Sequence, residues 1–397
     1  MDEWKEIYLG EVIKIKHGYA FKSEYFSDEG EYIVLTPGNF FEEGGFKLRE
    51  DKNKFYSSEY PKEYLLSKED LIIAMTEQGD GLLGSSALIP DDNKFLHNQR
   101  LGLVQIKDDE KIDKIYLYYL FNTSILRSQI FASATGLKVR HTAPERVYKC
   151  RVNIPPLPIQ KKIAAILSAY DDLIENNLKQ IRLLEEMAQI TYQEWFVRLQ
   201  FPNHENTPID ETTGLPIGWE NCLFGDIVKN FDNKRIPLSS AQRLQKKGVY
   251  PYYGAASIFD YIDEYIFDGK YLLMGEDGTV ITTKGTPSIQ FVNGKFWVNN
   301  HSHVLRGTKV STEFLYVFLN QYQIAGHITG SAQPKINQKN MNLIKVTVAS
   351  KNVMLSFDDL LIPIFEQIFN LNKQNQRLKE ARDILLPRLM TGKITVD

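Results

Sequence analysis

The sequence contains only two cysteines and no long apolar run. Cys150 and Cys222 are too few for a disulfide scaffold and cannot close a zinc site by themselves. No run of about 18 apolar residues is present, so the sequence predicts no transmembrane helix and no contact with a membrane. The first residues, Met1–Lys5, lack the charged-then-apolar order of a signal peptide. We therefore expect a cytoplasmic protein.

Catalytic motifs are missing as well. In Asn153-Ile154-Pro155-Pro156-Leu157 the residues differ from the Asn/Asp-Pro-Pro-aromatic loop of adenine methyltransferases, in which an aromatic ring stacks on the flipped base. No Gly-x-x-x-x-Gly-Lys-Ser/Thr loop for ATP phosphates occurs. Asp91 with Asp109, Glu110 and Lys111 loosely fits a magnesium nuclease site, but such spacing arises easily by chance. A self-contained methyltransferase or nuclease is therefore disfavoured.

Composition and charge indicate a folded protein with distinct surfaces. Hydrophobic residues make up 43% of the chain and charged residues 24%, which is ordinary for a globular protein, and 397 residues suit two or three domains. The net charge of −3 excludes a wholly basic nucleic-acid binder, but DNA responds to the local field and not to the sum. Aromatic residues make up 12% of the chain, which favours β-rich cores and recognition surfaces.

Two segments of the chain repeat in the same order. Trp4 to Lys14 recurs as Trp219 to Lys229, with an offset of 215 residues (219 − 4 and 225 − 10). Thr135-Gly136 recurs as Thr329-Gly330 with an offset of 194 (330 − 136), and basic residues follow in both places. Several matches in one order indicate two copies of one unit, the second shorter in its middle by 21 residues (215 − 194).

Each copy ends in a long helical pattern. Apolar residues recur at helical spacing from Pro158 to about Arg198, and again from about residue 353 to 392. A helix of about 40 residues is about 60 Å long and overhangs a small domain, so each stripe needs a partner helix. The predicted seam between the two helices contains Ile166, Ile174, Asn177, Ile181, Leu184, Ile364, Ile368, Leu371, Asn375 and Leu378. Asn177 and Asn375 either fix the register or are simply solvated.

Several short elements follow one another along almost the whole chain. They are Trp4 to Lys14, Thr135-Gly136, Pro155-Pro156-Leu157-Pro158-Ile159-Gln160, Glu194-Trp195-Phe196, Leu215-Pro216-Ile217-Gly218-Trp219 and Thr329-Gly330-Ser331-Ala332-Gln333-Pro334-Lys335. Together they resemble the specificity subunit of Type I restriction-modification enzymes. One departure is that the second helix has no Pro-rich segment before it, which leaves its first residue open.

The resemblance implies an α+β fold with two β-rich target-recognition domains in a pseudo-twofold repeat, separated by two long antiparallel coiled-coil helices. We expect recognition domains over 1–155 and, with a linker, 201–352, and spacer helices over 156–200 and 353–392. Each domain would read one half of a bipartite, asymmetric site in double-stranded DNA, and the helices would set the gap.

The resemblance also implies partners. Two modification subunits would use S-adenosylmethionine to methylate adenine, and restriction subunits would add ATP- and Mg²⁺-dependent translocation and cleavage. This chain is expected to bind no cofactor or metal and to be non-catalytic. A methylation-only or Type II-like system is the alternative within this class, and a coiled-coil assembly protein without a DNA role is the alternative outside it. Met187, Phe196, Phe365 and Phe369 lie beside the helical stripes, so we expect them to be exposed at a partner interface.

Basic and amide side chains could contact DNA in both copies. Lys and Arg bind phosphates, and Gln and Asn can pair with adenine edges. The candidates are Lys138, Arg140, Arg146, Lys234, Arg235, Gln333, Lys335, Asn337 and Lys339, with a further basic and aromatic patch at Arg243, Lys246 and Lys247. For any single residue, a solvated surface charge is the simpler alternative. His301 and His303 could supply half of a metal site, but no further Cys or His completes it.

Overall fold

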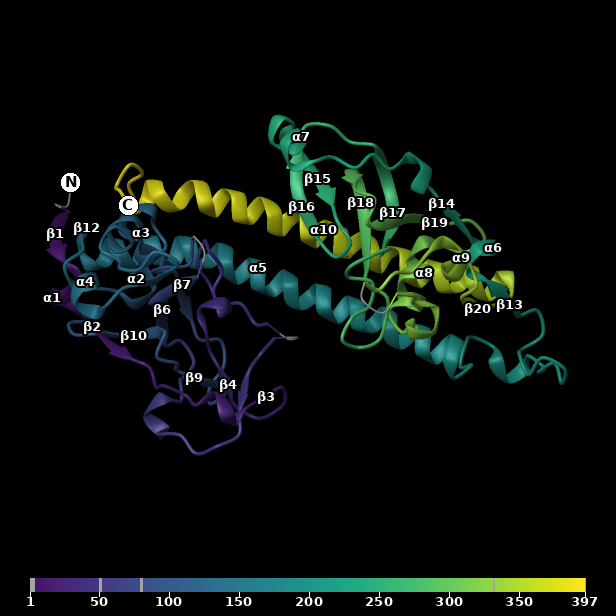
Figure 1. Cartoon of the computed structure of the whole chain (residues 1–397), viewed down its shortest axis with the longest axis horizontal. Coiled ribbons are helices and arrows are strands. Elements are labelled where there is room, and N and C mark those ends of the chain that lie inside the picture. The colour runs from purple at the N-terminus through teal and green to yellow at the C-terminus, as the bar shows by residue number, and fades with distance from the viewer. Residues whose placement is uncertain (1–3, 50–51, 79–80, 331–332, 397) are drawn as a thin grey trace. The chain divides into compact units, whose positions relative to one another are not determined.

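The computed structural model describes residues 4–49, 52–78, 81–330 and 333–396, and none of the helices in these ranges could span a membrane. The chain forms two compact units. Unit 1 comprises Met1–Glu175 and Asn375–Asp397, and unit 2 comprises Asn176–Gln374. The boundary falls inside each of the two long helices, α5 (Leu157–Tyr192) and α10 (Lys351–Leu389), both of which can be followed in Figure 1.

Unit 1 contains the first copy of the repeat. Its strands are β1 (Lys5–Tyr8), β2 (Ile13–His17), β3 (Phe26–Ser27), β4 (Ile33–Val34), β5 (Phe55–Tyr56), β6 (Leu71–Ala74), β7 (Thr76–Gln78), β8 (Ser86–Leu88), β9 (Phe95–Leu96), β10 (Leu101–Ile106), β11 (Val139–His141) and β12 (Arg151–Ile154). Its short helices are α1 (Leu9–Val12), α2 (Lys114–Phe121), α3 (Ser124–Ala132) and α4 (Pro144–Tyr148). The strands pair in the orders β1-β12, β2-β10-β6-β8, β11-β7 and β3-β5-β4-β9.

Unit 2 contains the second copy. Its strands are β13 (Glu220–Leu223), β14 (Val228–Asn230), β15 (Lys247–Tyr253), β16 (Ile258–Ile262), β17 (Phe267–Gly275), β18 (Ile289–Val298), β19 (Ser302–Gly307) and β20 (Lys345–Val348). Its short helices are α6 (Phe224–Ile227), α7 (Ser240–Gln245), α8 (Thr312–Leu319) and α9 (Gln338–Asn342). The strands pair in the orders β13-β20 and β14-β19-β17-β18-β15-β16. The mixed helix and strand content of both units confirms the predicted α+β class.

The strand registers confirm the predicted repeat. In unit 1, Lys5 of β1 pairs with Ile154 of β12, and in unit 2, Glu220 of β13 pairs with Val348 of β20. The first strand of each pair is offset by 215 (220 − 5) and the second by 194 (348 − 154), as in the sequence. Both β12 and β20 bury alternate residues, because one face of each pair packs on the core and the other meets solvent.

Glycine is required where two short helices cross in each copy. A Cβ added to Gly10 of α1 would lie 2.7 Å from the Tyr148 Cβ at the end of α4. A Cβ added to Gly225 of α6 would lie 2.8 Å from the Asn342 Cβ at the end of α9. Both distances are below contact distance, so the Trp-to-Lys repeat keeps a glycine for close packing and not for a turn.

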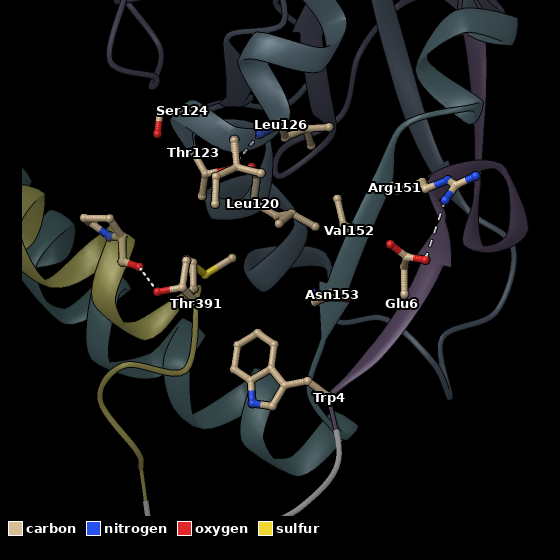
Figure 2. A pocket seen from close by; sticks show the side chains of 13 residues that line it. Trp4, Glu6, Leu120, Thr123, Ser124, Leu126, Arg151, Val152, Asn153 and Thr391 are labelled. Atoms are coloured by element: carbon tan, nitrogen blue, oxygen red, sulfur yellow. Dashed lines mark hydrogen bonds and ion pairs between the residues drawn. The ribbon is translucent and has the colours of Figure 1, made fainter.

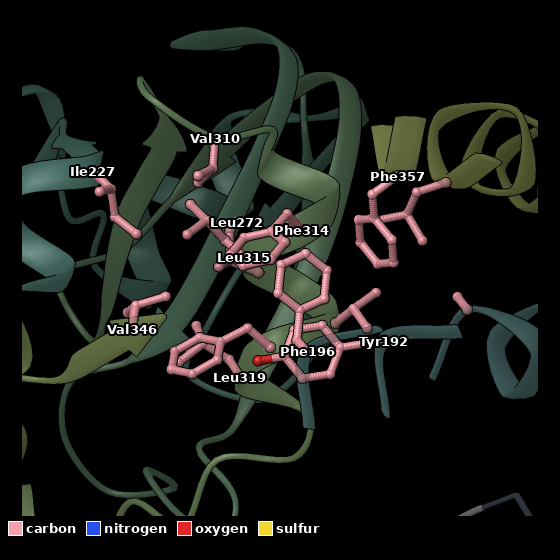
Figure 3. Packing of buried hydrophobic residues seen from close by; sticks show 14 of the residues in the cluster. Tyr192, Phe196, Ile227, Leu272, Val310, Phe314, Leu315, Leu319, Val346 and Phe357 are labelled. Carbon is pink, nitrogen blue, oxygen red and sulfur yellow. The ribbon is translucent and has the colours of Figure 1, made fainter. Parts of the chain in front are cut away.

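The cores explain which end residues of the helices are buried. Figure 3 shows Tyr192, the last residue of α5, and Phe196, in the π-helical turn Gln193–Val197 that follows, packed against Phe314 and Phe357 in unit 2. The Phe196 ring lies 5.1 Å from Phe314 and 4.9 Å from Phe357, centroid to centroid. The expected exposure of Phe196 is therefore wrong.

The expected exposure of Phe365 and Phe369 is wrong for the same reason. Phe365 is 2% exposed in the unit 2 core, and Phe369 packs partly buried against it. Within the predicted linker, Phe201 is buried against Trp219 with ring centroids 5.0 Å apart. The aromatic side chains of the second copy bury a large apolar area, so Phe201, Phe365 and Phe369 pack against them.

The two long helices begin at equivalent positions. Helix α5 begins at Leu157 and α10 at Lys351, an offset of 194 (351 − 157), which settles the first residue of the second helix. The Pro-rich segment has a local role, because the fully buried Gln160 side chain accepts from the Asp113 amide at 2.9 Å and donates to the Pro155 carbonyl at 2.8 Å. Met354, 194 residues further on, fills the equivalent position and needs no such partners.

The predicted seam residues all lie on the covered side of the helices. Ile174, Asn177, Ile181, Ile364, Ile368, Leu371 and Asn375 are buried, and Ile166, Leu184 and Leu378 are half-buried. Asn177 and Asn375 are 7% and 5% exposed, so neither is a solvated surface residue. Within unit 2 the Asn177 amide donates to the Gln374 side-chain oxygen at 3.5 Å.

Candidate DNA-binding surfaces

Both copies carry the same glycine hairpin at the predicted DNA-contact loop. In unit 1, Thr135 and His141 exchange two backbone hydrogen bonds of 3.0 and 2.8 Å. In unit 2, Thr329 and Lys335 exchange two of 2.8 Å. Gly136 and Gly330 have φ of +101° and +87°, and a Cβ on either would clash with a backbone carbonyl within the hairpin. The hairpins are therefore equivalent; Ser331 and Ala332 of the second lie outside the described residues.

The unit 1 hairpin presents exposed side chains from a braced frame. Leu137 is 99% exposed and Lys138 is exposed beside it. Arg140 stacks on the Phe131 ring with its guanidinium carbon 4.0 Å from the centroid. Arg146 donates to the Ser133 carbonyl at 2.7 Å and to the Thr135 hydroxyl at 3.2 Å, so it braces the base of the hairpin.

The candidates of unit 2 divide into exposed side chains and supporting ones. Lys234, Gln333, Lys335, Asn337 and Lys339 are exposed. Asn337 caps α9, because its side-chain oxygen accepts from the Asn340 amide at 2.8 Å.

Arg235 lies inside unit 2 and not on its surface. Its side chain is 13% exposed, and its guanidinium donates to Glu276 at 2.6 Å and to the Ser302 carbonyl at 2.7 Å. In the further patch Lys246 pairs with Glu264 at 2.7 Å, and Lys247 and Arg243 share Asp260 at 2.5 and 3.4 Å. Arg235 therefore does not supply the free positive charge that the sequence predicted, and both lysines of the patch are already paired with acids.

A buried charge network lies beneath the unit 2 hairpin. His303 of β19 is 1% exposed, and its Nδ1 lies 2.6 Å from the Asp232 carboxylate and 3.8 Å from that of Glu276. Burial opposes charge on His303, but the hydrogen bond and charge of Asp232, the Ile336 carbonyl and Glu276 raise the pKa of the imidazole. Burial likewise opposes charge on Asp232, but His303 and its other hydrogen-bond donors lower the pKa of the carboxyl.

Asp232, Glu276 and His303 are close enough together to suggest a metal site, since their ligand atoms lie within 4.8 Å of one another. The donor set does not fit a cation. The Arg235 guanidinium already contacts Glu276 at 2.6 Å and Asp232 at 3.5 Å. Both ring nitrogens of His303 face oxygen acceptors, and a ring that donates to both has no lone pair to offer a metal.

Unit 1 has a pocket of about 230 Å³ where its first and last segments meet α2 and α3. Figure 2 shows Trp4 on one side of it, Leu126 and Thr123 on another, and Thr391 between them. In unit 2 the equivalent Trp219 is covered by Phe196, with ring centroids 5.4 Å apart. The smaller Met390 takes the place of Phe196 in unit 1 (390 − 196 = 194), so the pocket is a packing difference between the copies.

The acidic residues considered for a nuclease lie on exposed turns. Asp91 faces Lys94 at 3.9 Å, and Lys111 pairs with Asp108 at 2.9 Å. Asp109 and Glu110 are exposed. These side chains form local surface ion pairs, and the described residues around them supply no buried acid that could activate a water.

The architecture defines a protein with two copies of one recognition domain, each ending in a long helix and each presenting a glycine hairpin with basic residues. A family model described as "Type I restriction modification DNA specificity domain" matches residues 1–186 and 216–380. The chain belongs to this family and contains two copies of its domain.

Named relatives and a solved structure agree with this assignment. The MjaIX specificity subunit of Methanocaldococcus jannaschii is 28% identical over 77% of this chain and 74% of its own length. The MjaVIII specificity subunit of the same organism is 22% identical over 100% of this chain and 94% of its own length. The S subunit of a Type I restriction-modification system from M. genitalium has a TM-score of 0.60 and 17% identity over 100% of this chain and 97% of its own, which shows the shared fold.

Proposed function

We propose that this chain is the DNA-recognition subunit of a Type I restriction-modification complex. Each copy reads one half of a bipartite, asymmetric site, and the helices α5 and α10 set the gap between the halves. The observation that carries the proposal is the pair of glycine hairpins, held by the same backbone hydrogen bonds in both copies and bearing exposed Lys138 in one and Lys335 in the other. Equivalent frames with different side chains suit two different half-sites.

The exposed face of the long helices supports a role for partner subunits. Leu183, Met187 and Ile190 of α5 follow one another at spacings of four and three and are 56%, 47% and 50% exposed. Ile384 of α10 is the equivalent of Ile190 (384 − 190 = 194) and is 54% exposed. Large apolar groups in a row on a helix usually mark an interface. The repetition of one of these positions, Ile190 with Ile384, suits two copies of one modification subunit.

The remaining parts of the proposal concern the complex. S-adenosylmethionine would be bound by the modification subunits, and ATP and Mg²⁺ by restriction subunits, because the sequence lacks a methyltransferase loop and a phosphate-binding loop. The chain itself then works in the cytoplasm as a non-catalytic reader. Light scattering of the complex co-purified with the modification subunit tests the stoichiometry, and a one-to-one complex would contradict the twofold argument.

Selection of duplexes from a random pool, followed by sequencing, tests the function directly. We expect an asymmetric consensus in two blocks separated by a fixed gap. A chimaera in which about residues 20–130 come from a relative should change one block only. If the chain selects no sequence, or if both blocks change together, modular reading is wrong.

A salt series tests how the hairpins bind. Replacing one phosphate-contacting lysine should lower the slope of log affinity against log salt by about one. We expect this for Lys138→Ala and Lys335→Ala. Lys246→Ala is the matched control, because that side chain is already paired with Glu264. If the unmodified chain and all three variants show the same salt slope, the hairpins do not contact DNA phosphates.

A further inference from the structure

His303 is buried with an acceptor at each ring nitrogen. Its Nδ1 lies 2.6 Å from the Asp232 carboxylate and its Nε2 lies 2.9 Å from the Ile336 carbonyl. A neutral imidazole has one N–H and can satisfy only one of them, whereas the imidazolium donates to both. His97 in unit 1 is the contrast: it is also buried, only its Nε2 has a hydrogen-bond partner, and burial lowers its pKa to about 4.

The two bonds of His303 join the hairpin of unit 2 to its sheet. Ile336 is the residue after Lys335, which closes the hairpin, and its amide donates to the Glu276 carbonyl at 2.9 Å. Its carbonyl accepts from His303, so both polar groups of this one peptide position are held by the network. Arg235 completes the network by bridging Glu276 and Asp232.

Unit 1 has the same backbone hydrogen bonds at the equivalent positions. The Thr142 amide donates to the Met75 carbonyl at 3.0 Å, as the Ile336 amide does to Glu276. The Met75 amide in turn donates to the Arg100 carbonyl at 3.0 Å, as that of Glu276 does to His301 at 2.8 Å.

Unit 1 lacks the charges, however. Strand registers align Asp232, Glu276 and His303 with His17, Met75 and Gly102, because Val228 pairs with Gly307 as Ile13 pairs with Ile106. The unit 1 hairpin is held instead by a strand ladder. Three residue pairs join β11 to β7, and the Thr76 hydroxyl meets His141 Nδ1 at 3.1 Å. In the described part of the unit 2 hairpin the corresponding pairing is a single bridge between Asp277 and Lys335.

We infer that protonated His303 is a positioning residue for recognition of one half-site: it holds the unit 2 hairpin in place where unit 1 uses a strand ladder. This inference rests on the proposed function, since the hairpin matters to recognition only if it meets DNA. It makes one half of the site depend on a titrating group and leaves the other half independent of it.

The sign of the pH dependence follows from the groups around the ring. Asp232 and Glu276 face His303 directly, Arg235 contacts both carboxylates, and Asp277, His301 and Lys335 lie at the adjoining bridge. The pKa of His303 is raised above 6.5, so its contribution is full below about that pH and is lost as the pH rises through the raised value. The pKa of Asp232 is lowered below 3.8, so its charge persists at every pH at which His303 titrates.

Two measurements on the full chain test the inference. The first is the ¹⁵N spectrum of the histidine rings, in which His303 should be doubly protonated at about pH 7 and His97 neutral. The second is equilibrium binding of the selected duplex from about pH 6.5 to about pH 9.5. The variant is His303→Gln, and His97→Gln is the matched buried control in unit 1. Lys335→Ala and Lys138→Ala mark which block of the site belongs to which unit.

We expect the unmodified chain to lose affinity at alkaline pH. We expect His303→Gln to weaken binding about tenfold, to lose discrimination only in the block marked by Lys335→Ala, and to remove this alkaline loss. A neutral His303 at pH 7, or a loss of discrimination spread over both blocks, would overturn the inference. If His303→Gln does not fold, Asp232→Asn removes the same charge pair and is judged by the same two results. If the chain selects no duplex, the proposed function fails, and the ring spectrum alone still decides whether the charged network exists.

Discussion

A partly buried ion pair joins the two long helices within unit 1, and its removal should measurably destabilise that unit. Asp171 of α5 accepts from Arg382 of α10 at 2.5 Å and from the Tyr119 hydroxyl of α2 at 2.5 Å. The two charged side chains are 28% and 15% exposed. Burial opposes charge on Arg382, but Asp171 and Asp383 raise the pKa of its guanidinium above the ordinary value. Asp171→Asn keeps the shape and removes the charge.

The expected loss of stability depends on which partners Arg382 keeps after Asp171 is replaced. Removing one partner of a fully buried pair costs about 3–5 kcal/mol, because the other charge stays buried alone. Arg382 keeps a contact of 2.9 Å to Asp383, which is 56% exposed, so we expect a smaller loss of about 2–3 kcal/mol in the free energy of unfolding of unit 1. For a unit of this size that corresponds to a fall in melting temperature of about 4–12 °C.

Calorimetry of the full chain, with urea unfolding beside it, measures this loss. Asp383→Asn is the matched control and should cost less than about 0.5 kcal/mol, because its carboxylate is exposed. The double variant Asp171→Leu with Arg382→Leu should lose less than either single variant, since no unpaired charge remains. If Asp171→Asn costs no more than Asp383→Asn, the pair does not stabilise unit 1 and the reasoning fails.

Three further predictions concern the helix crossing in unit 2, the gap between the half-sites and the tip of the unit 1 hairpin. Gly225→Ala should cost about 1–3 kcal/mol by urea unfolding, because its Cβ meets Asn342 at 2.8 Å, whereas Gly326→Ala, with no atom within 4 Å, should cost nothing measurable. Inserting four residues into α5 adds about 6 Å, so selection should return the same two blocks with a gap about one to two base pairs longer; an unchanged gap would refute the spacer role. Leu137→Asp should leave unfolding within about 0.5 kcal/mol, because Leu137 is 99% exposed, but should weaken duplex binding; unchanged binding would remove the tip from the interface.

The repeat and the helices could be predicted because their signals lie in the spacing of residues. Offsets of 215 and 194 residues in the sequence reappear in strand pairing, and the stripe from Ile174 to Leu184 lies on the covered face of α5. In the sequence, Gly10 and Gly225 could be recognised only as matching residues of the repeat. Their physical reason, a helix crossing closer than a Cβ permits, needs the position of a residue more than 100 positions away in the chain.

The site could be predicted less well because a charged residue looks the same in sequence whether it faces solvent or the core. Arg235 and Lys234 are neighbours, yet Lys234 is exposed and Arg235 joins Glu276 in a buried network. The partner that turns Arg235 inward is 41 residues away (276 − 235), and neither local propensity nor periodicity reports such a pair. His303 was visible as one of two closely spaced histidines, but its role follows only from Asp232 and Ile336.

The two copies support equivalent hairpins by different contacts. This difference affects which substitutions each copy can accept when its DNA specificity changes. Backbone hydrogen bonds fix each hairpin in both copies and do not depend on side-chain identity, so the middle of a copy can vary while the frame persists. In unit 1 the support is a strand ladder, which tolerates exchange of exposed residues. In unit 2 it is a network in which Asp232, Arg235, Glu276 and His303 satisfy one another, so a change in one leaves a buried charge unpaired. Substitutions beneath the hairpin should therefore be accepted singly in unit 1 but only as compensating sets in unit 2.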